Sequence, residues 1–214
     1  TLSSTVGIPN FTGPDLNQAR VNLPGTVQMR TPYPGQLHRG YIQSWNLFVE
    51  RKFAGDIKIE AGYVGTQTVR ALGDTEGNAA EPGGVQPLNA KYGRTASTLL
   101  WDGQFSANYH SLQVAINRRF ANGFFLKGAY TWSKAIGICC NDDNNGRPRV
   151  QALQYWDLNR TLLNSDRTHN LQISGVFELP FGKGRRFQTG NGFADYVLGG
   201  WQLNTLTTFL SGTP

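Results

Sequence analysis

The sequence predicts an all-β fold, an antiparallel up-and-down meander of about six strands. Apolar and polar residues alternate in six segments, which are 41–53, 56–70, 106–120, 123–137, 167–181 and 197–210. The connections between them alternate too, because short glycine-containing turns are separated by long polar stretches at 73–105 and 138–166. We therefore predict a loop-rich segment at 1–40 and a β-sheet wall over 41–214.

The composition is that of a folded chain rich in strands and loops. Hydrophobic residues make up 39% of the 214 residues and 26 are glycine, so the chain is too apolar for disorder and too rich in glycine to be mostly helical. No stretch approaches the roughly 18 apolar residues of a spanning helix. The chain opens without a signal peptide and stops within a strand-like pattern, so we expect a fragment of a larger protein.

The net charge of +6 raises the question of nucleic-acid binding. The basic residues are spread in small groups, such as Arg51-Lys52, Arg118-Arg119 and 183–186, and are not gathered on one helix. We therefore predict no nucleic-acid partner. In an up-and-down sheet, these three groups are expected on the same rim.

Each predicted strand has one apolar and one polar face. In the third strand, Leu112, Val114 and Ile116 share one face, while Gln113 and Asn117 share the other. The outward face of a soluble β-sandwich is usually richer in charge than these polar positions, although its strands alternate as well. The pattern therefore favours a wall that separates an apolar environment from water.

Opposite charges favour one register for the first hairpin, with a three-residue loop at 53–55. That register predicts three facing pairs: Lys52 with Asp56, Glu50 with Lys58, and Trp45 with Tyr63.

A second loop, at 121–123, is expected to close the next hairpin in the same way. It predicts five facing pairs, the last two joined by side-chain hydrogen bonds: Phe120 with Phe124, Val114 with Tyr130, Leu112 with Trp132, Gln113 with Thr131, and Ser111 with Ser133.

Aromatic residues gather toward both ends of the apolar faces. Those expected toward the long loops are Trp45, Tyr63, Tyr130, Trp132 and Trp201, and those expected toward the short turns are Phe53, Phe120, Phe124 and Phe181. From Trp45 to Phe53 is eight residues, about 26 Å along a strand and roughly 20 Å across the sheet after a tilt near 40°. This spacing is close to the ~25 Å lipid-facing band of an outer-membrane barrel, and we predict that these aromatic residues face lipid.

Four blocks of the sequence resemble one known family. They are "WNLFVERKFAGDIKIEAGYVGTQ" (45–67), "NYHSLQVAINRRFANGFFLKGAYTWSKAIG" (108–137), "DRTHNLQISGVFELPFGKGRRF" (166–187) and "GGWQLNTLTTFLSGTP" (199–214). In order and spacing they are similar to the carboxy-terminal barrel of TonB-dependent receptors, particularly the Oar-like proteins. The resemblance covers about residues 35 to 214.

That resemblance implies a fragment of a bacterial outer-membrane receptor or transporter, whose wall and extracellular loops serve ligand uptake. The family implies a barrel of about 22 strands around a plug, and this chain has no counterpart of the signal peptide, the amino-terminal β-sandwich, the plug or the TonB-binding segment. The expected partners are outer-membrane lipid, the remainder of the parent barrel with its plug, an unknown small ligand, and TonB only through missing regions. A soluble β-rich enzyme or glycan-binding module is the alternative.

The sequence predicts no enzyme and no cofactor. Asp166, Arg167, His169 and Asn170 combine an acid with a histidine, but no nucleophile motif accompanies them. The block resembles a family hallmark without catalysis. We expect a structural role, with Asp166 and Arg167 paired where a long loop returns to the wall.

Three further groups are candidates for binding. Cys139, Cys140 and Asp142 are weak candidates for metal capture, against a solvated loop, and the thiols could equally be bridged, free or cross-linked between chains. The basic run at 182–186 differs from a phosphate loop and is expected near anionic headgroups or on a solvated rim. The candidates for stacking on a ligand, against packing within their own loops, are Tyr155, Trp156 and Tyr92.

Overall fold

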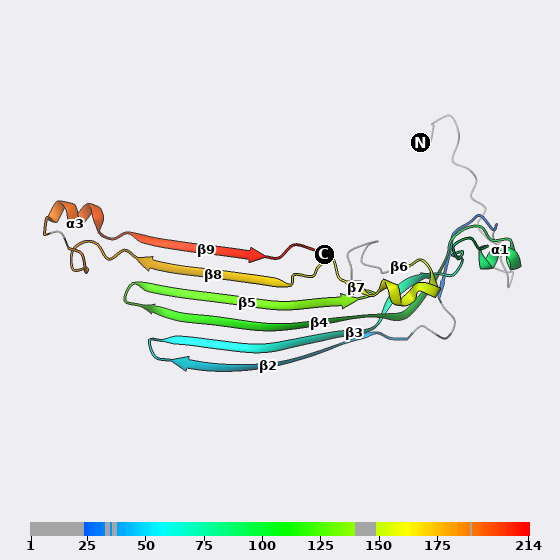
Figure 1. Cartoon of the computed structure of the whole chain (residues 1–214), viewed down its shortest axis with the longest axis horizontal. Coiled ribbons are helices and arrows are strands. Elements are labelled where there is room, and N and C mark those ends of the chain that lie inside the picture. Colours follow the sequence, from blue (N-terminus) through cyan, green and yellow to red (C-terminus); the bar gives the residue numbers. More distant parts are fainter. Residues whose placement is uncertain (1–23, 33–34, 36–37, 140–148, 189) are drawn as a thin grey trace, which may run out of the picture.

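The computed structural model describes residues 24–32, 35, 38–139, 149–188 and 190–214. Six long strands form one antiparallel sheet in the order β2-β3-β4-β5-β8-β9 (Figure 1). Their bounds are β2 (Tyr41–Phe53), β3 (Ile57–Glu76), β4 (Thr98–Ala121), β5 (Phe124–Gly137), β8 (His169–Glu178) and β9 (Gln202–Leu210). The predicted all-β, up-and-down meander is therefore confirmed.

Shorter elements lie before and between the long strands. They are β1 (Met29–Pro32), the helix α1 (Pro87–Tyr92), β6 (Arg149–Val150), the 3-10 helix η1 (Leu153–Asn159), β7 (Thr161–Leu162) and the helix α3 (Gly192–Leu198). Strand β1 pairs with β4, β6 with β3, and β7 with β5. Within the described residues, no helix has the length and hydropathy needed to cross a bilayer.

The connections sort into two ends of the sheet. Figure 1 shows the two tight turns and α3 at one end, which we call the turn end, and α1, β6 and η1 at the opposite loop end. The two strands β3 and β4 continue beyond the other strands toward the loop end, pairing as far as Glu76 and Leu99. We call this extension the loop-end hairpin.

The loop-end hairpin corrects the prediction of a loop over all of 73–105. Residues 73–76 and 98–105 are strand, and only the segment between them holds the turn and α1. The prediction failed here because Asp74, Thr75 and Asp102 are polar but buried, which hides the strand alternation.

The register of the β2–β3 hairpin also differs from the prediction, by two residues. Phe53 pairs with Ile57, so the loop is 54–56 and contains two residues with positive φ, Gly55 at 77° and Asp56 at 57°. Glycine and aspartate both tolerate this left-handed conformation, which lets the turn shift along the chain.

Aromatic rings over glycines explain why this register is formed. Trp45 faces Gly65 and Phe48 faces Gly62, and in both cases the ring occupies the space that a Cβ on the glycine would need. Like charges now face each other directly, but opposite charges still meet diagonally. Lys58 Nζ lies 2.6 Å from Glu50 Oε2 and Lys52 Nζ lies 3.6 Å from Asp56 Oδ1, so the charge argument identified the partners and missed their offset.

The β4–β5 register was predicted correctly at its centre and wrongly at its turn. The pairs Ser111–Ser133, Leu112–Trp132, Gln113–Thr131 and Val114–Tyr130 are present. The turn has two residues, Asn122 and Gly123, both with positive φ as a type I′ turn requires. Phe124 therefore faces Ala121, and a bulge between Arg118 and Ala121 removes the predicted pair with Phe120.

The predicted side-chain bonds of this hairpin are replaced by others. Gln113 Nε2 donates to Ser111 Oγ at 3.3 Å along the same strand, rather than to Thr131. Ser133 Oγ donates to the carbonyl of Arg167 at 2.9 Å, which ties β5 to the returning loop.

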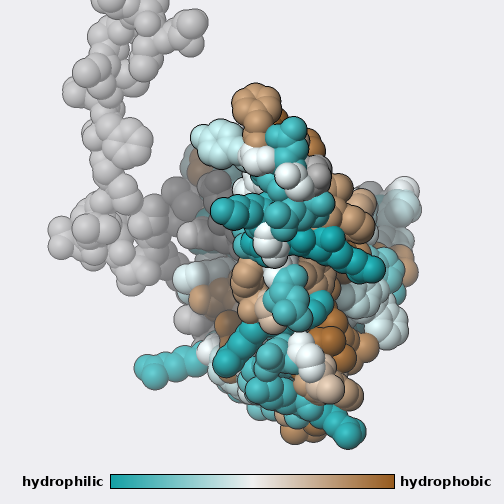
Figure 2. Space-filling view, turned by 90° about the vertical axis from the view of Figure 1, so that its left-hand side faces the viewer, coloured by the Kyte–Doolittle hydropathy of each residue, from teal (hydrophilic) through white to brown (hydrophobic). Residues whose placement is uncertain are grey.

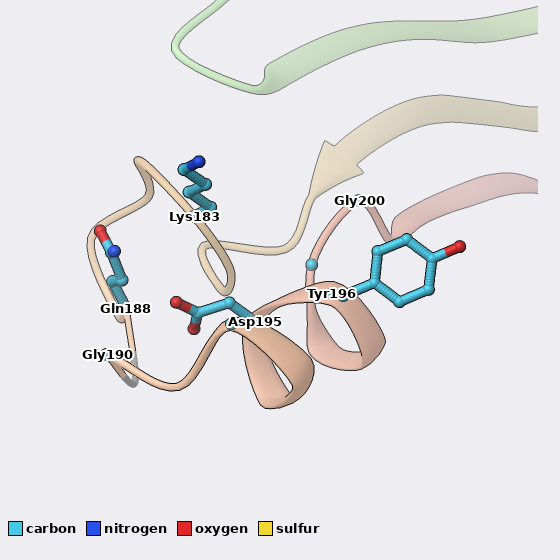
Figure 3. Close-up of a pocket in the computed structure, with 8 residues that line it drawn as sticks. Lys183, Gln188, Gly190, Asp195, Tyr196 and Gly200 are labelled. Carbon is cyan, nitrogen blue, oxygen red and sulfur yellow. The ribbon is translucent and has the colours of Figure 1, made fainter.

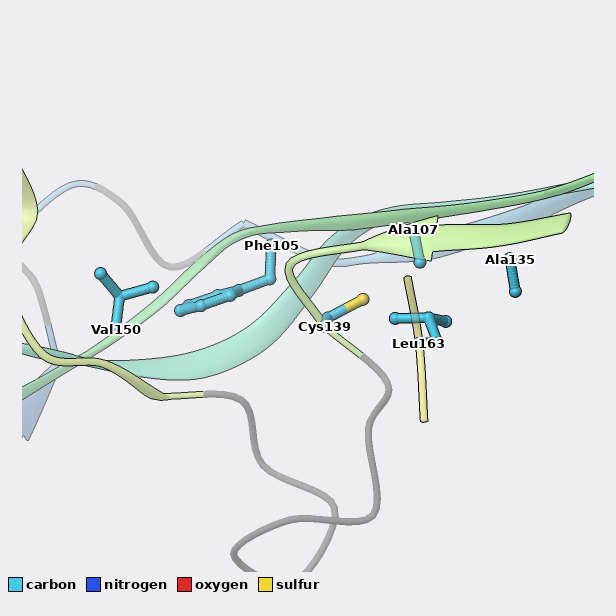
Figure 4. Packing of buried hydrophobic residues seen from close by; sticks show 6 residues of the cluster. All are labelled: Phe105, Ala107, Ala135, Cys139, Val150 and Leu163. Carbon is cyan, nitrogen blue, oxygen red and sulfur yellow. The ribbon is translucent and has the colours of Figure 1, made fainter. Parts of the chain in front are cut away.

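The buried apolar core lies at the loop end and not along the span of the sheet. It comprises Phe105, Ala107, Ala135, Cys139, Val150 and Leu163 (Figure 4). Ala107 and Ala135 alternate onto the polar face, on the same side as Tyr109, which pairs with Ala135. The loop residues of this core, including Leu163 and Val150, therefore fold against the polar face and leave the apolar face uncovered.

We expect Gly62→Val to destabilise the sheet by about 1–3 kcal/mol, because the new side chain would overlap the Phe48 ring. Ala61→Val is the matched control, since Ala61 adjoins Gly62 and is exposed on the other face. The measurement is a urea titration of each variant in detergent micelles. Equal losses of stability in the two variants would contradict the role of the glycine.

Candidate functional site

The apolar face of the sheet is continuous across all six strands and has no covering layer in the described part of the chain. Direct pairing aligns one row across the sheet: Val49, Ala61, Val114, Tyr130, Leu171 and Phe209. Leu47 and Leu203, from the two outer strands, are 71% and 61% exposed. Figure 2 looks onto the turn end and shows hydrophilic side chains across it, with hydrophobic residues gathered behind and to the right.

A soluble sandwich would bury this face against a second sheet. Trp45 and Phe177 remain 40% and 42% exposed, on opposite ends of the face. An apolar surface of this extent exceeds what a soluble monomer normally leaves in water, so it needs a partner.

The loop-end part of the apolar face carries an aromatic belt that also includes histidines. Tyr63 Oη lies 2.6 Å from His110 Nδ1, and Tyr130 Oη lies 2.8 Å from His169 Nδ1, with the rings stacked in both pairs. Sequence reasoning missed these pairs. Alternation could have indicated His110, which stands two residues before Leu112 and therefore on the same face.

The turn-end part of the apolar face carries phenylalanines with arginines above them. Arg51 Cζ lies 5.2 Å from the centre of the Phe53 ring, and Arg118 Cζ lies 4.8 Å from that of Phe124. Phe124 also meets Phe177 edge-on, with ring centres 6.4 Å apart. The basic pairs at 51–52 and 118–119 and the run at 182–186 adjoin this end, as the up-and-down topology predicted.

Trp201 lies at the opposite end of the apolar face from the one that the sequence predicted. It directly precedes β9, and its carbonyl accepts from the Leu179 amide at the turn end, rather than near the long loops. The prediction placed it wrongly because it began the last strand at 197, where the structure has α3. Phe209 takes the corresponding loop-end position, since it pairs with Leu171.

Phe120 and Phe181 lie near the turn end, where the sequence placed them. Phe120 is 51% exposed beside the bulge, and Phe181 packs on Phe187 with ring centres 5.6 Å apart. That the predicted aromatic residues face lipid remains a prediction.

The polar face contains a hollow of about 300 Å³ near the loop end. Its side chains come from β4, β5, β8 and the preceding loop, and include Tyr109, Gln113, Thr131, Arg167 and Asn170. Hydroxyl, amide and guanidinium groups therefore converge on the polar face of the sheet, next to the loops of the loop end.

The Asp166 carboxylate holds the returning loop to the wall. Its Oδ1 accepts from the Ala135 amide at 2.6 Å and its Oδ2 from Thr168 Oγ1 at 3.1 Å, with the residue 3% exposed. The expected partner, Arg167, contributes its carbonyl to Ser133 instead of pairing with Asp166. Two of the four hallmark residues thus lie apart on opposite faces, with Asn170 in the polar hollow and His169 in the aromatic belt.

The loop-end hairpin is organised around Glu76, which lies beyond the part of the sheet that all six strands share. Burial raises the pKa of Glu76, but hydrogen bonds from Ser97 and the amides of Thr98 and Asn78, together with Arg149, outweigh it and lower the pKa overall. The Arg149 guanidinium lies 3.1 Å from the carboxylate.

Asp102, in the same hairpin, has the opposite electrostatic environment. Burial, together with the nearby charge of Asp74, raises its pKa despite hydrogen bonds from Gln104 and Thr75. One oxygen of each aspartate is buried without a hydrogen-bond partner. Arg30 pairs with the other Asp74 oxygen at 2.7 Å.

The candidate ligand-stacking residues differ in their surroundings. Trp156 packs against Phe105, with ring centres 5.1 Å apart, and so supports the loop core. Tyr155 and Tyr92 are 43% and 62% exposed, on η1 and α1. Ligand contact by these residues remains a prediction, and the packing of Trp156 on Phe105 is what its alternative role within the loops requires.

The metal hypothesis involves residues that are mostly outside the described ranges. Cys140 and Asp142 lie outside them, whereas Cys139 is buried and disulfide-bonded. A bridged sulfur offers no thiolate ligand. In the part of the chain that is described, no group of three or more His, Cys, Asp or Glu residues could hold a metal ion.

A second hollow, of about 540 Å³, lies at the turn end between α3 and the basic turn. Lys183, Gln188, Asp195 and Tyr196 line it (Figure 3). Asn191 caps α3 by accepting from the Phe193 amide at 3.0 Å. This hollow belongs to the turn itself and is far along the sheet from η1 and α1 (Figure 1).

Asp166→Ala should destabilise the protein by about 1–3 kcal/mol, because it leaves the Ala135 amide without its acceptor. Arg167→Ala is the control, since this residue ties the loop through its backbone carbonyl. Urea titrations in micelles compare the two variants. A loss for Arg167→Ala as large as that for Asp166→Ala would contradict the assignment.

Two neutralising variants of the loop-end hairpin should show opposite effects of pH. Glu76→Gln removes a stabilisation that is present above the ordinary glutamate pKa and is lost as pH falls through the lowered folded-state pKa. We expect a loss of about 1.5–3 kcal/mol at neutral pH, from charged hydrogen bonds, which shrinks in acid.

Asp102→Asn should instead stabilise the hairpin at neutral pH, with the gain appearing as pH rises above the ordinary aspartate pKa. Urea titrations at neutral pH and below both ordinary carboxylate pKa values measure the two effects. A pH-independent difference in either variant would refute its electrostatic cause.

The comparisons with known proteins agree with the two-faced sheet. The sequence matches a family described as an outer membrane beta barrel domain over residues 1–214. No curated protein and no solved structure matches it. Because the match covers the whole sequence, the chain belongs to the outer membrane beta barrel domain family and is located in the bacterial outer membrane.

Proposed function

We propose that this chain forms part of the wall and extracellular loops of a TonB-dependent receptor, with the apolar face toward lipid and the polar face toward a plugged lumen. The observation that carries the proposal is the uncovered apolar face, bounded by aromatic residues at both ends. Hydrocarbon chains supply the partner that this face lacks, as in other transmembrane barrels.

The direction in which the loops fold supports a filled lumen. The loop core packs on the polar side, through Ala107 and Ala135, so the loops bend over the interior of the proposed barrel. The polar hollow with Tyr109, Arg167 and Asn170 then lies directly beneath them, where it would meet a plug or an entering ligand.

The proposed ligand is a small molecule taken up by the intact receptor. Exposed Tyr155 and Tyr92 would contact it from the loops by stacking. Within this proposal the chain has no catalytic role, and TonB acts only through other parts of the intact protein. The soluble alternative is not favoured, because a soluble module would bury the apolar face.

Single cysteines in the intact parent protein test this proposal in whole cells. Gln113 and Val114 are adjacent and face opposite sides of β4. We expect Gln113→Cys to be protected from a membrane-impermeant maleimide while the plug is present and to react once the plug is deleted. Val114→Cys should stay protected in both, because lipid covers it.

The two positions separate the parts of the proposal. Labelling of Val114→Cys in the plugged protein would contradict the lipid-facing assignment. Labelling of Gln113→Cys with the plug domain in place would indicate an open pore and not a TonB-dependent receptor.

A further inference from the structure

We propose that the turn end of the apolar face holds one glycerophospholipid, with its phosphate on Arg118 and an acyl chain in the groove over Gly128. This inference rests on the proposed assignment of the apolar face to lipid.

The groove is formed by a missing side chain. Gly128 stands between Ile116 and Ile173 in the row across β4, β5 and β8. The resulting hollow of about 200 Å³ is lined almost wholly by apolar atoms, from Val114, Ile116, Leu126, Tyr130, Leu171 and Ile173. From Leu126 to Tyr130 it runs roughly 13 Å along the strand, which suits an extended hydrocarbon segment.

Arg118 stands at the turn end of this groove. It faces Leu126, which lines the groove, and its guanidinium lies over Phe124 at 4.8 Å. Stacking on an aromatic ring fixes the guanidinium plane, so that its two terminal nitrogens can donate to a phosphate. The headgroup and the chain of one lipid would therefore be held in line.

Within the described ranges, the charge of Arg118 has no ion-pair partner. Its Nε is buried without a hydrogen-bond partner, and the ion pairs of the described residues involve other basic side chains. Arg51 repeats the arrangement over Phe53 on the edge strand, also on the apolar face. Charge complementarity thus favours an anionic phosphodiester at the level of the lipid headgroups.

The test measures lipid binding to the full chain, purified in neutral detergent, by native mass spectrometry. The probes are dioleoyl phosphatidylglycerol, oleate and inorganic phosphate. We expect Arg118→Gln to weaken phosphatidylglycerol binding roughly fivefold, the order of effect of one basic residue beside an anionic membrane surface. Lys127→Gln is the matched control, because Lys127 is exposed on the polar face and pairs with Asn117 and Ser174.

Further variants separate the headgroup from the chain. Gly128→Ala should weaken phosphatidylglycerol and oleate binding alike, because the added methyl group, 2.9 Å from Ile116 Cγ2, fills the groove and displaces the Ile116 side chain. Arg118→Lys should give an intermediate loss, since it keeps the charge and loses the planar fork. This conservative variant serves if the glutamine variant does not fold.

Three outcomes would overturn the inference. They are equal losses for Arg118→Gln and Lys127→Gln, displacement of the lipid by inorganic phosphate at equal concentration, and oleate binding as tight as that of the phospholipid. Brominated lipids distinguish a failure of the underlying assignment. If they do not quench tryptophan fluorescence, the apolar face does not meet lipid; if they quench while the variants behave alike, only the phosphate site is wrong.

Discussion

Backbone pairing between neighbouring strands is the constraint on which the rest of this structure depends. Each strand alternates between two kinds of side chain, and direct pairing carries that alternation from β2 to β9 without a change of face. A slip of one residue at any pair would move apolar residues to the wet side. The observed register of the first hairpin differs from the predicted one by two residues, an even number, so each side chain stays on its predicted face of the sheet.

The same constraint explains why the chain has so small a core. Over the length that the six long strands share, the sheet is a single layer. Its apolar side chains therefore face outward and do not form an interior core. Among the described residues, the buried apolar cluster lies around Phe105, where loop segments return against the loop ends of β4 and β5. Polar groups fill much of that junction, and Glu76 and Asp166 satisfy backbone amides of segments distant in sequence. Hydrogen bonds therefore hold the loops in addition to the packing around Phe105.

Alternation allowed the strands, the two faces and the two ends to be predicted from the sequence, since a period of two is a local property. Offsets within a hairpin were harder. The first register was judged from charge, yet the fit of Trp45 over Gly65 fixes it, and long charged side chains reach their partners diagonally. The strand ends near Asp74 and Asp102 were missed because their burial comes from tertiary contacts. The pairing of Tyr63 with His110, between residues 47 apart, likewise needs the register before it can be seen.

The edges of the sheet connect the fold to the proposed function. Both β2 and β9 have only one neighbour among the described strands, so each presents a row of backbone groups on its free side. Leu206 and Leu210 lie on the otherwise polar face of β9 and are 81% and 56% exposed. Open edges invite further strands, and in a membrane every edge must be paired because lipid offers no hydrogen bonds. Under the proposed function, strands of the parent barrel complete both edges, and the two leucines would pack against the neighbouring wall or the plug.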